Sequence, residues 1–304
     1  MKKIFFVLFF SNSLVYAQTN KSWIDEWQKS TVSIGIIDTL IRGKLKVPYF
    51  RVIGTGVIFY VKYDTILVPC LVTAKHVFYN PIENWNPSSI RIRFSWFDEK
   101  PVDKYLGVEL LLKENKNKLW YSHPNNNVDL ACLPFLIPDN VDVGKSLSTL
   151  AYKDISSNDA IYEGSQILVL GYPGNIGKEF HSKALVRFGI ISWVPPLISY
   201  DNKILIDCNV YPGNSGGPVF KMPNGMQRDG SLKIGGSISF IGIVTEQGLE
   251  LNDVLLKQKN LPPIPLQDSS GSKLLTLESI GIGVIEPASH VRELLAYVQK
   301  EINK

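Results

Sequence analysis

Short runs of alternating apolar and polar residues, separated by Gly, Pro and Asn, make up most of the chain. The run Ser89–Trp96 alternates strictly, as a strand with one buried face requires. The runs Thr55–Val61 and Thr65–Val72 flank the polar residues Lys62–Asp64 and indicate the two arms of a hairpin. Many short strands with such turns predict an all-β sandwich or barrel. Further strands are expected at Ser30–Ile37, Val108–Leu112, Leu130–Phe135, Gln166–Leu170, Ala184–Ser192, Lys203–Cys208, Gly217–Phe220, Ser237–Thr245 and Ser279–Ile285.

One convincing helix is predicted, and it lies at the end of the chain. Ser289, which follows Pro287, is its expected N-cap. Apolar residues then repeat at the spacing of one helix face, at Val291, Leu294, Leu295, Val298 and Ile302.

The first seventeen residues predict a secretory signal peptide. Lys2 and Lys3 precede the apolar run Ile4–Phe10, and cleavage is expected after Ala17. The run is far shorter than the roughly 20 apolar residues that cross a bilayer. The mature chain is therefore expected to be exported, periplasmic or secreted, and to have no membrane span.

The charges are scattered along the chain. The net charge of +4 includes Lys2 and Lys3, so the mature chain carries about +2. Nucleic-acid binding is not expected, because Lys and Arg form no cluster.

Cysteine content argues against a disulfide framework. Cys70, Cys132 and Cys208 are an odd number, and each lies in an apolar stretch. Buried thiols are expected, and a Cys70–Cys132 bridge is the alternative.

Candidate chemistry is concentrated in the segment Pro212–Pro218, with the sequence PGNSGGP. A serine hydroxyl needs a base to take its proton and donors to hold a developing oxyanion. The glycines around Ser215 allow a sharp turn that aims backbone N–H groups at one point. A Gly-rich turn without chemistry would give the same pattern.

The motif also fits the nucleophile elbow of α/β-hydrolases, where an acid and then a histidine follow the serine. Asp253 or Asp268, followed by His290, would supply that order. The elbow requires a helix directly after the serine, and Gly216–Pro218 is a poor helix start. The order histidine, aspartate, serine is therefore favoured.

His76 is the preferred base, because an apolar strand ends just before it in Cys70–Val77. The other three histidines, His123, His181 and His290, are expected to be dispensable; His123 is expected to be exposed, and His181 lies in a predicted loop.

Asp129 is the preferred acid, since it stands where a polar turn enters the apolar segment Leu130–Leu133. Asp207 is the rival. Its place close to Ser215 in the sequence makes a supporting role for the nucleophile loop more natural.

In that order, the segments TAKH, VDLACL and GNSGGP resemble the TAAH, DIAL and GDSGGP blocks of chymotrypsin-like serine proteases. The similarity is closer to the high-temperature-requirement (HtrA/Deg) branch. LVLGYPG at 168–174 resembles its AIGNPFG, and GIGVIEP at 281–287 resembles its GIGFAIP. The resemblance runs from about Ser30 onward, and no segment is left for the PDZ domain that many such proteins carry.

This resemblance implies two antiparallel six-stranded β-barrels followed by a C-terminal α-helix. The expected boundaries are a signal peptide at 1–17, a first barrel at 18–140, a linker at 141–154, a second barrel at 155–288 and a helix at 289–304. It further implies an endopeptidase with His76, Asp129 and Ser215 as triad, and with the N–H groups of Gly213 and Ser215 as oxyanion hole. No metal or other cofactor is implied.

Substrates are expected to be proteins or peptides, and the oligomeric state is left open. By the resemblance, the primary specificity pocket is formed by Asn209, Val210, Thr245 and Gln247. Two alternatives remain, a binding or chaperone-like protein with little turnover, and an esterase.

Overall fold

The computed structural model describes residues 23–42, 45–95, 107–137, 161–174, 176, 182–196, 203–236, 238–253, 255–256, 264–265 and 275–304. The predicted signal peptide and the predicted linker at 141–154 lie outside these ranges. No helix in the described ranges is long and apolar enough to cross a membrane.

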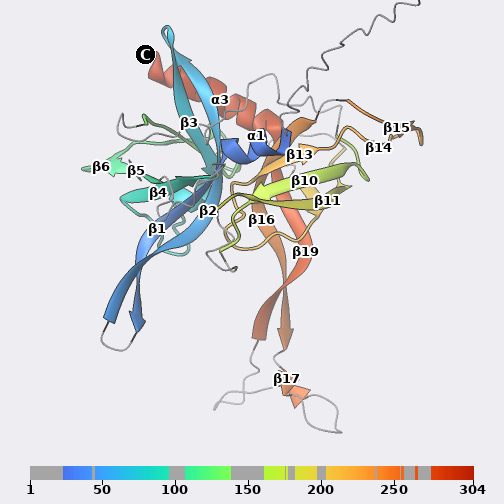
Figure 1. Ribbon diagram of the computed structural model, residues 1–304, viewed down its shortest axis with the longest axis horizontal. Helices are drawn as coiled ribbons and strands as arrows, with labels where there is room; N and C mark the ends of the chain where they lie inside the picture. The colour runs from blue at the N-terminus through green and yellow to red at the C-terminus, as the bar shows by residue number, and fades with distance from the viewer. Residues whose placement is uncertain are drawn as a thin grey trace, which may run out of the picture.

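The first half of the chain forms a seven-stranded antiparallel sheet, on the left in Figure 1. Strand β4 (Ser89–Phe94) of this sheet is buried at every second residue, as its alternating sequence predicts. The strand order is β5 (Gly107–Leu111), β4 (Ser89–Phe94), β1 (Thr31–Arg42), β2 (Leu45–Tyr63), β3 (Ile66–Ala74), β9 (Leu130–Pro134) and β8 (Tyr121–Ser122).

In the described residues the first sheet is a half-barrel, where a closed six-stranded barrel was predicted. The sheet has seven strands, and its edge strands β5 and β8 do not pair with each other. Closure would need a continuous hydrogen-bonded ladder between them. β8 supplies only two residues, so it offers β5 too little backbone for such a ladder.

The second half forms a closed antiparallel barrel of six strands, as predicted. The segment after Ser215 is a strand, which excludes the α/β-hydrolase alternative. The barrel order is β10 (Gln166–Gly171), β11 (Leu185–Trp193), β12 (Ile204–Asp207), β19 (Leu275–Pro287), β16 (Ser239–Asp253) and β13 (Pro218–Lys221).

Three two-stranded hairpins extend from these sheets. They are β6 (Lys113–Glu114) with β7 (Asn117–Lys118), β14 (Gly225–Met226) with β15 (Leu232–Lys233), and β17 (Leu255–Leu256) with β18 (Ile264–Pro265).

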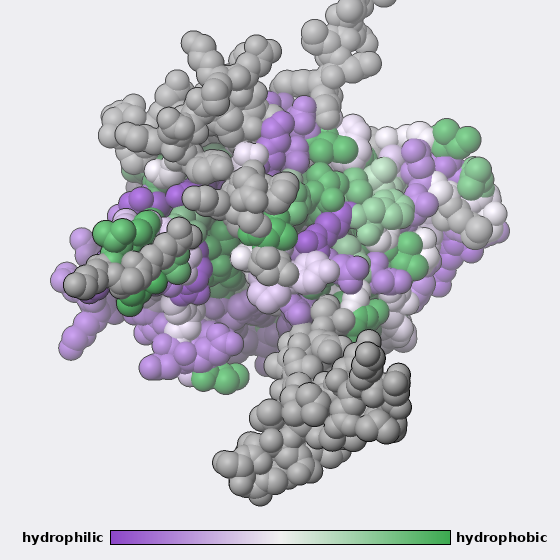
Figure 2. Space-filling view, turned by 60° about the horizontal axis from the view of Figure 1, so that its bottom comes forward, coloured by the Kyte–Doolittle hydropathy of each residue, from purple (hydrophilic) through white to green (hydrophobic). Residues whose placement is uncertain are grey.

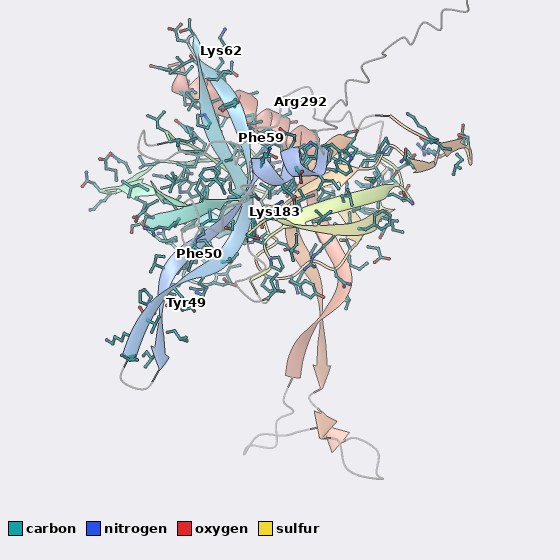
Figure 3. The ribbon with its side chains drawn as sticks, viewed as in Figure 1. Tyr49, Phe50, Phe59, Lys62, Lys183 and Arg292 are labelled. Carbon is teal, nitrogen blue, oxygen red and sulfur yellow. The ribbon has the colours of Figure 1, made fainter. Side chains whose placement is uncertain are left out.

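The long β1–β2 hairpin projects away from the body of the molecule (Figure 1). Ile41 and Leu45 near its end are 68% and 69% exposed, and Figure 2 shows an apolar patch there, at the left. Figure 3 shows Tyr49 along this arm and Phe59 farther along β2, where the two sheets meet.

A core shared by both sheets holds the two halves together. Phe59 of β2 packs edge-on against Phe240 of β16, with ring centroids 5.5 Å apart, and Phe240 packs against Phe220 of β13 at 5.9 Å. Fully burying side chains of this size contributes roughly 1.5–3 kcal/mol each. The elements that carry residues from both halves are therefore held in a fixed relation.

The C-terminal helix α3 (Ala288–Ile302) lies across both halves (Figure 1) and buries the predicted apolar face. The helix begins at Ala288, two residues earlier than Ser289 as N-cap would require. The N-cap is Pro287, without a side-chain hydrogen bond. Pro287 ends β19 and fixes the backbone for the helix start, so no capping side chain is needed.

Two further helices were not predicted. α2 (Lys75–Phe78) is a single turn after β3, and α1 (Trp23–Ser30) lies at the junction of the two sheets in Figure 1. Trp27 of α1 stacks on Phe220 at 3.5 Å between centroids. Gln28 donates to the carbonyl of Ala184 at 2.6 Å, so α1 is tied to the second barrel before the chain enters β1.

All three thiols are free and buried, as the sequence predicts. Cys70 on β3 and Cys132 on β9 lie on neighbouring strands, two residues apart in register. Burial raises the pKa of the Cys132 thiol well above its usual range, and the hydrogen bond with Cys70 adds to this. These thiols therefore pack as small apolar side chains.

Candidate active site

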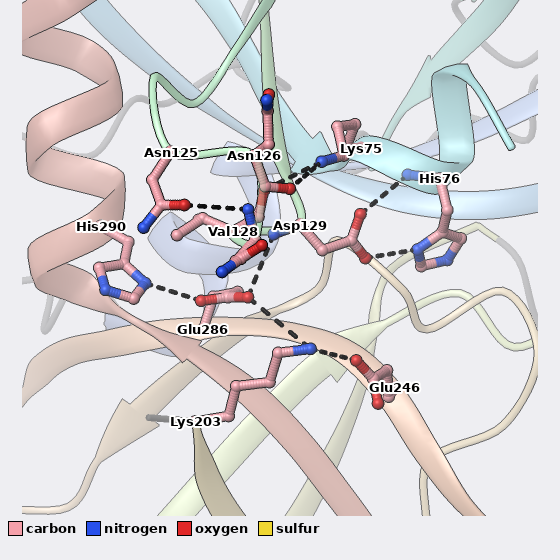
Figure 4. Close-up of polar contacts among 11 residues, drawn as sticks. Lys75, His76, Asn125, Asn126, Val128, Asp129, Lys203, Glu246, Glu286 and His290 are labelled. Atoms are coloured by element: carbon pink, nitrogen blue, oxygen red, sulfur yellow. Dashed lines mark hydrogen bonds and ion pairs between the residues drawn. The ribbon is translucent and has the colours of Figure 1, made fainter. Parts of the chain in front are cut away.

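A histidine and a carboxylate meet where β3 ends and β9 begins. His76 Nδ1 lies 2.7 Å from Asp129 Oδ2, and the backbone N–H of His76 donates to Asp129 Oδ1 at 3.1 Å (Figure 4). The side chains are 35% and 19% exposed. A carboxylate accepts only, so Nδ1 of the neutral ring carries the proton and Nε2 is left as an acceptor.

Sheet register explains this meeting. Ala74, the last residue of β3, pairs with Leu130, the first residue of β9, which places Lys75 beside Asp129. Lys75 N–H donates to the carbonyl of Asp129 at 3.1 Å. The Lys75 ammonium donates to the carbonyls of Asn126 at 2.9 Å and Val128 at 3.3 Å, which fixes the turn before Asp129 (Figure 4).

A buried carboxylate from the other half of the chain supports Asp129, and sequence reasoning missed it. Glu286 of β19 is fully buried, and its Oε1 accepts the backbone N–H of Asp129 at 3.1 Å. Its Oε2 lies 2.7 Å from His290 Nδ1, and Lys203 Nζ lies 4.0 Å from Oε1 (Figure 4). The signal in the sequence was a charged residue within the apolar run GIGVIEP.

The expectation that His123 is exposed is wrong, because its ring is 2% exposed. Its backbone N–H donates to Leu130 at 3.1 Å, which folds it under α3, where its ring centroid lies 5.6 Å from that of His290. Burial, followed by the charge of His290, lowers the pKa of His123. The expectation for His181 falls outside the described residues.

Ser215 sits on a tight turn whose neighbours are buried while it is half-buried itself. Its carbonyl accepts the N–H of Thr55, and Gly216 N–H donates to Val244 at 2.7 Å. Gly216 has a φ of +90°, and a Cβ there would lie 1.9 Å from the Thr55 carbonyl oxygen. Only glycine can occupy this position without moving β2.

The turn that carries Ser215 and the residue that follows His76 both lie beside Gly54 of β2. A Cβ added to Gly54 would lie 2.7 Å from Val77, the neighbour of His76, and 3.3 Å from the Ser215 carbonyl oxygen. No hydrogen bond joins the Ser215 hydroxyl to the His76 ring in this structure. His76 and Gly213 do line one cleft of about 470 Å³, together with Trp85 and Arg51.

Two backbone donors of the serine turn point at no described acceptor. The N–H groups of Gly213 and Ser215 form no hydrogen bond within the described part of the chain, whereas Asn214 N–H donates to Tyr211 at 2.9 Å. Thr55 Oγ1 donates to the Gly213 carbonyl at 2.7 Å. Gly213 has a φ of +97°. The turn is thus held from several sides while two N–H groups stay available.

The four residues of the predicted specificity pocket lie on two segments, the loop after β12 and strand β16. Asn209 is exposed, Val210 is 1% exposed in the barrel core, Thr245 is 2% exposed and Gln247 is half-buried on β16. Among described residues the Thr245 hydroxyl has no hydrogen-bond partner. The assignment of these residues to a pocket stays a prediction. The rival acid Asp207 is exposed on β12 and does not contact His76.

Similarity to known proteins identifies the family of the chain. No curated protein is significantly similar to the chain. Among solved structures, the HtrA-type protease AlgW with a decapeptide is similar at a TM-score of 0.47 and 16% identity, over 92% of this chain. The chain spans 65% of that structure's chain. Residues 54–225, more than half of the sequence, match the trypsin-like peptidase domain. The chain belongs to the family of trypsin-like peptidase domains.

Proposed function

We propose that the chain is a serine endopeptidase that works through an acyl-enzyme. Ser215 Oγ attacks the scissile carbonyl while His76 Nε2 takes the hydroxyl proton. His76 then delivers that proton to the leaving amine, and a water molecule, activated in the same way, releases the acyl group. The observation that carries the proposal is the His76–Asp129 pair, in which two hydrogen bonds from one residue fix the carboxylate.

Asp129 has two tasks in this scheme. It keeps the His76 proton on Nδ1, so that Nε2 is the base, and its charge stabilises the imidazolium that forms during attack. The hydrogen bond between Ser215 and His76 forms when substrate enters, since such bonds are often long in the free enzyme and tighten in the complex.

The N–H groups of Gly213 and Ser215 are the proposed oxyanion hole. They are available for a ligand, and the bonds from Thr55 and Asn214 fix the turn that carries them. Losing one such donor typically costs about 3–4 kcal/mol of transition-state stabilisation.

Hydrolysis of casein, followed by release of soluble peptides, tests the proposal against its alternatives. An endopeptidase produces peptides with time, and a binding or chaperone-like protein does not. Matched ester and amide substrates distinguish an endopeptidase from an esterase. An esterase would hydrolyse the ester and leave the amide intact.

We further propose that the chain is exported after cleavage behind Ala17. The support is the sequence order of Lys2 and Lys3, the apolar run and small residues. The N-terminal sequence of the exported protein tests this, and a start at Gln18 is expected. Retention of the full chain in the cytoplasm would refute it.

Cleavage is expected after small or medium uncharged residues. The uncharged side chain of Asn209 cannot neutralise a buried cation. The guanidinium of Arg187 donates to the Asn209 backbone carbonyl and lies 4.5 Å from the centroid of the Tyr211 ring. Glu246 is already paired with Lys203. Profiling on a peptide library checks this, and a dominant preference for Arg or Lys would contradict it.

Activity is expected to need no proteolytic step beyond signal removal. In zymogen-type relatives a new N-terminal ammonium pairs with an Asp before the serine, whereas this chain has the uncharged, buried Asn214. A buried ammonium without a counter-charge would cost several kcal/mol. The nearest match to an inserted N-terminus starts at Val32, which is paired inside the sheet with Gly56 and Phe94.

The measurement compares mature chains that carry extra residues or a tag before Gln18. All should be equally active. A chain that stays inactive until trimmed to a defined start between Gln18 and Ser33 would disprove the expectation.

A further inference from the structure

A basic pocket lies next to the catalytic histidine, on the side of α2 and the β6–β7 hairpin. Its volume is about 760 Å³, within the usual range for specific ligand sites. Four lysines line it, although the basic residues were expected to form no cluster, and no described acidic residue lines it. We call it the lysine pocket, after Lys75, Lys113, Lys116 and Lys118.

None of the four ammonium groups forms an ion pair with a described carboxylate. Lys113 Nζ donates to the carbonyl of Asn86 at 2.8 Å, and Lys118 Nζ lies 3.3 Å from Ser122 Oγ. Lys75 Nζ bonds only to carbonyls. An ammonium has three donors, so each of these lysines keeps capacity for an anion. Bonds to neutral oxygens hold the charges in place without cancelling them.

The lysines also crowd one another. Lys118 lies with its ammonium 3.9 Å from the centroid of the Trp120 ring, at the floor of the lysine pocket. Burial, followed by the charge of Lys75, lowers the pKa of Lys118. A bound anion would relieve this repulsion, so the free pocket is electrostatically prepared for one.

The rest of the lining suits a polypeptide. Asn86, Asn115, Asn126 and Ser122 contribute side chains that both donate and accept hydrogen bonds, as peptide groups require. The charges are spread over separate elements rather than converging on one point, which fits several carboxylates better than a single compact ion.

We propose that the lysine pocket is an exosite that binds an acidic segment of a protein substrate. The proposal rests on the proposed function, because Lys75 is the neighbour of His76 and holds the turn before Asp129 (Figure 4). A chain bound in the pocket therefore lies beside the residues that would cleave it. Binding here adds affinity for acidic substrates and leaves the chemical step unchanged.

Binding is measured by anisotropy of a fluorescein-labelled hexaglutamate peptide, on the full Ser215→Ala chain so that nothing is cleaved. Hexaglutamate is expected to bind, more weakly at high salt, and hexaglutamine is not. The double change Lys113→Gln with Lys116→Gln should raise the Kd about tenfold, because two charge pairs are lost. Thermal melts confirm that each variant is folded.

The matched control is Lys62→Gln with Lys300→Gln, which removes the same charge at the far end of α3. It should change the Kd less than twofold. Equal weakening by both double variants would overturn the proposal, as would equal binding of hexaglutamate and hexaglutamine. Tripolyphosphate or an oligonucleotide that binds where hexaglutamate does not would also overturn it, in favour of a phosphate ligand.

The second part of the test measures the kinetics of substrate turnover. For a peptide substrate joined to an acidic segment, the Lys113 and Lys116 double variant should raise KM without changing kcat, and should leave a glutamine-segment substrate unaffected. If the proposed function is wrong, no chain will show turnover. The anisotropy measurement needs no catalysis, so it would still test the exosite proposal.

Discussion

Replacing Ser215 by alanine is expected to lower kcat for peptide hydrolysis by about 10⁶-fold, to the background set by binding and the oxyanion hole. The change removes one oxygen from a half-buried side chain whose carbonyl, not its hydroxyl, forms the fold contact with Thr55. The melting temperature should therefore stay within a few degrees. His76→Ala should be about equally damaging, because members of a triad act as a unit.

Ser231→Ala is the matched control, since Ser231 is an exposed serine beside the β14–β15 hairpin that bonds only to Asp229 and Gln227. Its kcat should equal that of the wild type. Comparable kcat in the wild type and Ser215→Ala would reject the triad.

Replacing Glu286 by alanine is expected to damage both stability and catalysis. The carboxylate is fully buried between the Asp129 N–H and His290. Removing one partner of a buried ionic contact typically costs about 3–5 kcal/mol of folding free energy. Losing a hydrogen bond to a charged group is worth roughly 1.5–3 kcal/mol, so kcat should fall by about 10- to 100-fold with little change in KM.

The Glu286→Gln variant separates the effect of Glu286 on the position of Asp129 from its effect on folding stability. The glutamine oxygen can still accept the Asp129 N–H, and its amide faces the His290 ring in place of a carboxylate oxygen. Stability should remain lowered while kcat returns to within a few fold of the wild type. If both variants lose stability and both keep a wild-type kcat, Glu286 has no part in positioning Asp129.

Local patterns in the sequence were enough for much of this architecture. The hairpin around Asp64 and the alternating strand β4 follow from period-two burial, and the C-terminal helix follows from apolar residues at helical spacing. The contact of His76 with Asp129 follows from the pairing of β3 with β9, two strands that the apolar runs before and after these residues predicted.

Features that depend on long-range packing were not predictable. The helix α1 is only eight residues long, and its stability comes from Trp27 on Phe220, a residue far away in the sequence. Glu286 meets Asp129 across 157 positions, and nothing near either residue announces the contact. The open edge of the first sheet depends on how few residues β8 contributes, which periodicity does not fix.

Labelling with a fluorophosphonate, followed by mass spectrometry of the digested protein, tests the triad most directly. The reagent reacts with a serine hydroxyl only when a base activates it, and it needs no knowledge of the substrate. One adduct is expected, on Ser215, and it should be lost in His76→Ala. An adduct on another residue, or equal labelling of Ser215 without His76, would contradict the proposed triad.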